Sequence, residues 1–210
     1  MTRRVVLITV DGSDHSEHAV AWAASHVTQP LDHVHLVTAL VPDANPSTGN
    51  HSDAPRPCSP DSEVKAPENW PADARAKWEH GIAERVSQAN EMLRKYADML
   101  FAGRNRDTRI HNPYIDKDSI TTQVIMDVSK VGPAVVKYAE DIKADLVVVG
   151  SRGLGSIKRK IMGLIGLGSV SDYLVHHLHC PAVVVKSQHT VLTAKNQEGV
   201  DILAEHSTTA

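Results

Sequence analysis

Five short runs of apolar, largely β-branched residues are spaced along the chain, at 4–10, 34–41, 121–128, 145–149 and 182–185. The fourth run is LVVV after Asp145, and the fifth is AVVV after Pro181. Continuous apolar runs of this length suit strands that are buried on both faces, as in a parallel sheet covered by helices. The pattern therefore predicts five strands.

Helical spacing separates these runs. Apolar residues recur every three or four positions in residues 16–27, 72–102, 132–143 and 170–178. Strand, helix and strand within the first 41 residues form a βαβ unit with parallel strands and a right-handed crossover. The alternation of five strands with four helices predicts an α/β fold, a five-stranded parallel doubly wound sheet in a three-layer α/β/α sandwich. We expect ligands beyond the carboxyl ends of its strands.

Three segments fall outside this alternation. Residues 42–71 hold seven of the eleven prolines and few apolar side chains, so we expect a mobile insertion there. Residues 103–119 are polar and predict a surface loop, and residues 187–210 predict a loose C-terminal tail. The interpretation is a single domain over residues 1–186 that carries two insertions.

Composition narrows the class of protein. A chain of 210 residues that is 41% hydrophobic but only 4% aromatic builds its core mainly from aliphatic side chains. The net charge of -3 argues against nucleic acid as a partner. The two cysteines, Cys58 and Cys180, do not form a disulfide framework. No apolar run is long enough to span a membrane, and the N-terminus does not read as a signal peptide, so we expect a soluble cytoplasmic protein.

The stretch from residue 144 to residue 186 carries the strongest chemical signal. A strand ends at Gly150, a loop with Gly153 follows, and Gly168 and Ser169 open a helix in which Asp172 completes a capping box. Glycines allow an anion to approach the backbone closely, and a helix N-terminus offers unpaired N–H groups and a positive dipole end. This arrangement suits phosphate. The alternative is that the glycines only form tight turns.

Three segments resemble the universal stress protein family, especially its plant-like, ATP-binding branch. They are VDGSDHSEHAVAWA (10–23), GPAVVKYAEDIKADLVVVGSRGLGSIKR (132–159) and GSVSDYLVHHLHCPAVVVK (168–186). The resemblance implies a Rossmann-like fold of the adenine nucleotide alpha hydrolase type, a role in the stress response, and ATP as ligand with Mg²⁺ as an optional companion. It also implies a homodimer in which residues 182–186 pair antiparallel with their symmetry mate.

The resemblance further implies the nucleotide site. Asp11 would contact the ribose, Thr9 and Val10 would border it, and the backbone of Ala39 would face the adenine. The phosphates would lie between two further groups: Gly150, Arg152 and Gly153 on one side, and Gly168, Ser169 and Val170 on the other.

The phosphate loop departs from the family pattern, which has G-x-x-G, nine residues, and then G-(S/T). Fourteen residues separate Gly153 from Gly168 here. Gly163 stands at the family spacing, but Leu164 follows it and supplies no hydroxyl. We therefore assign the motif to Gly168 and Ser169, which leaves residues 163–167 as an apolar bulge. Whether this bulge blocks the pocket or lies outside it stays open.

Other chemistry is less well supported. The thirteen histidines include His176, His177 and His179, but neighbouring residues on a helix diverge by about a hundred degrees, so no metal site is predicted there. We interpret His33 and His35 as surface residues of one strand face. The basic trio at 158–160 lies beside the phosphate loop and can steer an anion inward, or it is simply a solvated loop.

Three hypotheses about function remain. The first is an ATP-binding regulatory protein without fast turnover, for which we name no catalytic residue. The second is a dimeric scaffold that binds no nucleotide because residues 163–167 close the pocket. The third, an adenylyl-transferring or slowly ATP-hydrolysing enzyme, is disfavoured because residues 11–14 read Asp-Gly-Ser-Asp where related enzymes show H-x-G-H or S-G-G-x-D-S.

Overall fold

The computed structural model describes residues 3–40, 66, 68, 70–102, 117–126, 131–151 and 169–186. Within them, five parallel strands form one sheet in the order β3-β2-β1-β4-β5. The strands are β1 (Val5–Thr9), β2 (His33–Leu40), β3 (Ile120–Met126), β4 (Leu146–Gly150) and β5 (Ala182–Val185). The predicted doubly wound parallel sheet is confirmed.

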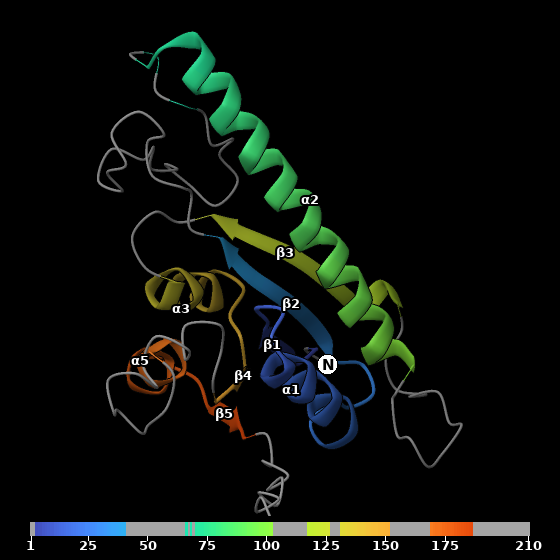
Figure 1. The fold of residues 1–210 in the computed structure, drawn as a ribbon. Coiled ribbons are helices and arrows are strands. Elements are labelled where there is room, and N and C mark those ends of the chain that lie inside the picture. The colour runs from blue at the N-terminus through green and yellow to red at the C-terminus, as the bar shows by residue number, and fades with distance from the viewer. Residues whose placement is uncertain are drawn as a thin grey trace, which may run out of the picture.

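Helices cover both faces of this sheet (Figure 1). They are α1 (Asp14–His26), α2 (Ala72–Ala102), α3 (Val131–Asp141) and α5 (Ser169–His177), and a 3-10 turn, η2, lies at Lys117–Ser119. Helices α1 and α2 lie on one face, and α3 and α5 lie on the other. The three-layer sandwich follows from this division.

The centre of the sheet divides its side chains between two cores. On β1, Val6 and Ile8 pack toward α1 and α2, whereas Leu7 packs toward α3 and α5, and all three are fully buried. Alternate side chains of a strand point to opposite faces, so a strand covered on both sides must be apolar at every position. The unbroken apolar runs in the sequence have this cause.

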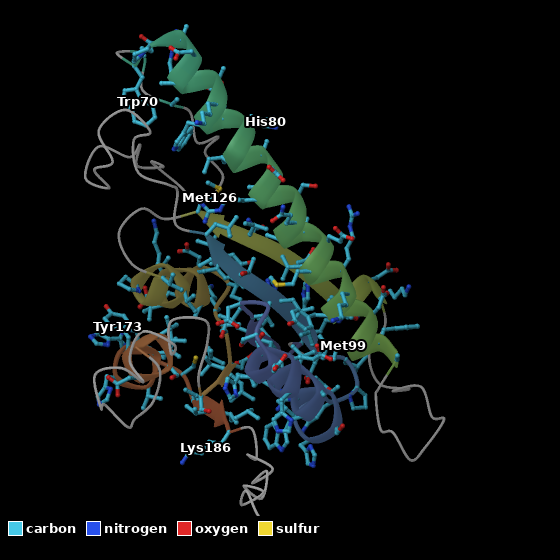
Figure 2. The ribbon with its side chains drawn as sticks, viewed as in Figure 1. Trp70, His80, Met99, Met126, Tyr173 and Lys186 are labelled. Atoms are coloured by element: carbon cyan, nitrogen blue, oxygen red, sulfur yellow. The ribbon has the colours of Figure 1, made fainter. Side chains whose placement is uncertain are left out.

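Helix α2 is much longer than the strands it covers. Its 31 residues span about 46 Å at 1.5 Å per residue, and its N-terminal half extends past the carboxyl end of β3 (Figure 1). There Trp70, Trp78 and Ile82 form a separate small core, against which Met126 at the end of β3 packs (Figure 2). The second core explains how this half of the helix is stabilised away from the sheet.

Most predicted boundaries agree with the structure to within two residues. Helix α2 matches the predicted range 72–102, while α1 begins at residue 14 and not at 16. It begins earlier because Ser13 is its N-cap, with a side chain that accepts a hydrogen bond from the Ser16 N–H at 3.3 Å. The strand predicted at 145–149 extends one residue further, because Gly150 is the last residue of β4.

Two expectations about polar residues need correction. The predicted loop at 103–119 ends in an ordered turn, η2, and its Ser119 is buried. His33 and His35 are not simple surface residues, since both are half-buried, with His33 hydrogen-bonded to Thr121 on β3 and His35 to Tyr138 on α3. The expected mobility of residues 42–71, and the expectations for 103–116 and 187–210, concern segments that lie almost wholly outside the described residues and stay predictions.

None of the helices among the described residues combines the length and the apolar character needed to cross a lipid bilayer.

Candidate functional site at the carboxyl edge of the sheet

The strand order creates a switch point between β1 and β4. From β1 the chain continues outward through β2 and β3 on one side, and β4 and β5 occupy the other side. The helices of the two halves lie on opposite faces, and in sheets of this topology ligands bind in a crevice outside the carboxyl ends of the strands at the switch point. Thr9 pairs with Val37 on one side and with Val149 on the other, which places it at the centre of this edge.

A tight turn follows β1 and fixes Asp11. The Val10 N–H donates to the Val37 carbonyl at 2.9 Å, which carries the sheet one residue beyond β1. Gly12 then adopts a φ of +79°, a left-handed conformation that favours glycine. The Ser13 N–H and Oγ both donate to Asp11 Oδ1, at 3.1 and 2.6 Å. The exposed Asp11 carboxylate is therefore held at the edge in one orientation.

Gly150 brings the end of β4 against this turn. A Cβ atom at residue 150 would lie 3.1 Å from the carbonyl oxygen of His15 and 3.2 Å from its carbonyl carbon, both in the first turn of α1. Backbone atoms cannot move aside as a flexible side chain can, so a larger residue would push α1 and β4 apart. The glycine thus allows the end of β4 to lie next to the first turn of α1, directly after the Asp11 turn.

Two buried serines join the other wall of the crevice to β4. The Ser151 N–H donates to the Val185 carbonyl at 2.8 Å, and Ser171 Oγ lies 3.5 Å from the Ser151 carbonyl oxygen. Ser171 is in the first turn of α5, so the N-terminus of that helix lies beside the end of β4. The sequence reasoning did not single out Ser171, although a hydroxyl in the first helical turn after a glycine loop is a recognisable signal.

Helix α5 is also fixed from its other side. Val170 packs with Leu174 against the core beneath α3 and α5. Tyr173 lies against Gly132 in the first turn of α3. The N-terminus of α5, which is the positive end of the helix dipole, is thereby aimed at the carboxyl edge of the sheet.

Comparison with known proteins identifies the family. The family model described as "Universal stress protein family" matches residues 2–186. The chain belongs to the universal stress protein family. Among curated proteins, the universal stress proteins PHOS32 and PHOS34 of Arabidopsis thaliana are 27% and 28% identical to it over 88% of this chain. The chain spans 65% of PHOS32 and 62% of PHOS34, less than two thirds of either relative.

Solved structures agree on the fold. The universal stress protein UspA from Lactobacillus plantarum is 18% identical and has a TM-score of 0.51, over 88% of this chain and 99% of that one. The hypothetical protein MJ0577 is 15% identical with a TM-score of 0.53, over 90% of this chain and 100% of that one. These similarities confirm the Rossmann-like α/β architecture of the family.

Within this universal stress protein, the structure describes some of the predicted site residues and leaves others outside the described ranges. Thr9, Asp11, Ala39 and Gly150 lie at the carboxyl ends of β1, β2 and β4 as expected, and Ser169 and Val170 open α5. Val10 is only 4% exposed and belongs to the core beneath α1 and α2, so it borders the crevice through its backbone alone. Arg152, Gly153 and Gly168, together with residues 158–160 and 163–167, lie outside the described residues, and their roles stay predictions.

Proposed function

We propose that this universal stress protein binds ATP at the carboxyl edge of its sheet and acts as a regulatory protein in the stress response, without fast turnover. The observation that carries the proposal is the convergence of three separate segments on the switch point. The Asp11 turn, the end of β4 at Gly150 and the first turn of α5 are far apart in sequence and adjacent at this edge. The resemblance to the family assigns each of these segments to one part of an adenine nucleotide.

Each part of the nucleotide has a matching group. The Asp11 carboxylate, oriented by Ser13, accepts hydrogen bonds from the ribose hydroxyls. The backbone of Ala39 at the end of β2 meets the adenine. The phosphates lie between residues 150–153 and the N-terminus of α5 at residues 168–170, where the helix dipole favours negative charge. Mg²⁺ accompanying the nucleotide would neutralise part of that charge.

The proposal assigns no residue to catalysis. Asp11 accepts hydrogen bonds from Ser13 and is assigned to the ribose, so the proposal gives it no role at the terminal phosphate. Any hydrolysis is then slow, because the proposal places no general base beside the terminal phosphate among the described residues. The protein would act through its nucleotide-bound and nucleotide-free states.

A second candidate function is a homodimeric scaffold. Among the described residues β5 pairs with β4 alone, so its outer edge offers unpaired backbone groups to a second copy. A bulge at residues 163–167 that closed the crevice would leave this dimer without a nucleotide. The two candidates share the dimer and differ in the ligand.

Calorimetry with ATP tests the proposal on the full chain. Asp11→Ala removes the charged acceptor for the ribose, worth about 1.5–3 kcal/mol, and should weaken ATP binding by roughly 10–100-fold. Asp14→Ala is the matched control, because Asp14 is an exposed aspartate of the same helix start and has no role in the proposed site. Equal affinities for Asp11→Ala and the parent would overturn the proposed site. A parent that is dimeric and binds no ATP would support the scaffold.

A further inference from the structure

A cluster of four polar side chains lies on the α3 face of the sheet, away from the nucleotide edge. His33 and His35 alternate along the amino-terminal half of β2, with the fully buried Val34 between them facing the opposite core. Thr121 on β3 and Tyr138 on α3 complete the cluster. Neither the family membership nor the proposed nucleotide site gives these residues a task.

Each histidine uses one ring nitrogen in a hydrogen bond to a hydroxyl group. His33 Nε2 lies 2.8 Å from Thr121 Oγ1, and His35 Nδ1 lies 3.0 Å from Tyr138 Oη. The two rings are 4.7 Å apart between centres and are tilted by 37°. When each of these nitrogens donates its proton to the hydroxyl oxygen, the lone pairs are left on His33 Nδ1 and His35 Nε2.

This is the arrangement that metal-binding histidines require. A histidine that binds a metal donates its other N–H to an orienting acceptor, which fixes the tautomer and the ring. Thr121 and Tyr138 come from different elements, which holds the two rings in place from both sides.

The spacing of the rings matches two ligands of one ion. An imidazole nitrogen binds such an ion at about 2.0–2.1 Å and lies roughly 1.1 Å from the ring centre, so each ring centre is about 3 Å from the ion. Two rings at adjacent coordination positions then have centres roughly 4.5–5 Å apart. The observed 4.7 Å falls within this interval.

We propose that His33 and His35 form a two-nitrogen binding site for a divalent transition metal, with copper(II) as the ion bound most tightly. Imidazole suits copper, nickel and zinc, and copper(II) leads the order of affinity among these ions. The described residues contain no group of three or more histidine, cysteine or acidic side chains, so the proposed site has two protein ligands among them. The site is independent of nucleotide binding, because it lies on the opposite half of β2 from Ala39.

Electron paramagnetic resonance of the full chain titrated with copper(II) tests this proposal. The parent should bind one copper(II) ion more tightly than all others, with a spectrum that shows coupling to two nitrogens. His33→Asn and His35→Asn should each abolish this signal. The control is His176→Asn/His177→Asn, which removes two exposed histidines at the end of α5 and should leave the tight site unchanged.

Tyr138→Phe separates metal binding from a purely structural role. It keeps both ligands and removes only the hydroxyl that orients His35, so copper affinity should fall by roughly 10–100-fold. The proposal fails if His33→Asn and His35→Asn both retain the tight two-nitrogen signal, or if Tyr138→Phe binds copper as tightly as the parent. Should His35→Asn not fold, His33→Asn and Tyr138→Phe decide the matter by the same two criteria.

Discussion

The ring of Tyr173 lies so close to Gly132 that a Cβ atom at residue 132 would be 2.6 Å from the ring carbon Cδ1 (Figure 2). The ring cannot turn away easily, because its other neighbour is His177, stacked on it at 3.7 Å between centres. Through this contact the first turn of α3 sets the position of α5. Residue 132 is therefore linked, through Tyr173, to the start of α5 in the proposed phosphate site.

We predict that Gly132→Ala destabilises the fold and weakens ATP binding. Overpacking of this kind costs about 1–3 kcal/mol of unfolding free energy, and a shift of Tyr173 displaces the start of α5. Gly81→Ala is the matched control, since nothing lies within 4 Å of a Cβ atom there and a helical glycine replaced by alanine gains about 0.5–1 kcal/mol. Urea unfolding and calorimetry measure both effects. A Gly132→Ala variant as stable as the parent would show that the contact is easily relieved.

ATP affinity should depend on the two sides of the phosphate loop. We predict micromolar binding by the parent and weaker binding by Gly153→Val and Ser169→Ala. The first places a branched side chain where the backbone would approach phosphate, and the second removes a hydroxyl from the first residue of α5. Unchanged calorimetric affinity in both variants would mean that the phosphates bind elsewhere.

The bulge at residues 163–167 should modulate binding without being needed for folding. Its deletion restores nine residues between Gly153 and Gly168, the spacing of the family. We predict a folded variant that binds ATP at least as tightly as the parent, measured by circular dichroism and calorimetry. An insoluble variant, or one that has lost ATP binding, would require the motif to be reassigned from Gly168 to Gly163.

The edge strand β5 allows a sharp test of the dimer. The carbonyls of Pro181 and Val185 accept hydrogen bonds from the N–H groups of Val147 and Ser151. In a parallel pair, alternate residues direct their backbone groups toward the same neighbouring strand. The backbone groups of Val183 therefore face β4, and those of Val184 face outward. Val184→Pro removes an outward N–H and keeps the bonds to β4, whereas Val183→Pro, the control, breaks the sheet. Light scattering should show a dimeric parent and a largely monomeric Val184→Pro. A parent that is monomeric at high micromolar concentration would refute pairing through β5.

Cys180 should be a slow nucleophile at neutral pH. Burial raises the pKa of its thiol, so the thiolate is scarce until the pH exceeds the ordinary value near 9.0. The folded state then holds its proton more strongly than the unfolded state, and this contribution to stability is present below pH 9.0 and is lost as the pH rises through the folded pKa. Iodoacetamide labelling of a Cys58→Ser variant at several pH values measures the pKa of the Cys180 thiol. A labelling rate at pH 7.5 equal to that of the unfolded chain would contradict the raised pKa.

The sequence by itself determined the order and type of the elements. Strand and helix periodicities are local properties, so the apolar runs at 145–149 and 182–185 and the spacing over 72–102 could be interpreted without knowledge of any partner. The alternation of the two then restricts the topology, because parallel strands need crossover helices. The residues at strand ends, Asp11 and Gly150 among them, follow from the topology, since parallel strands end at the same edge.

Contacts between distant segments were decided only by the tertiary structure. Gly150 faces the backbone of His15, 135 positions earlier in the chain, and no local pattern predicts that approach. His33 and His35 have the alternation of a polar strand face, and their half-buried state depends on Tyr138, which α3 brings over that face. Burial and hydrogen bonding are properties of the packed pair, so they exist only once α3 has docked on the sheet.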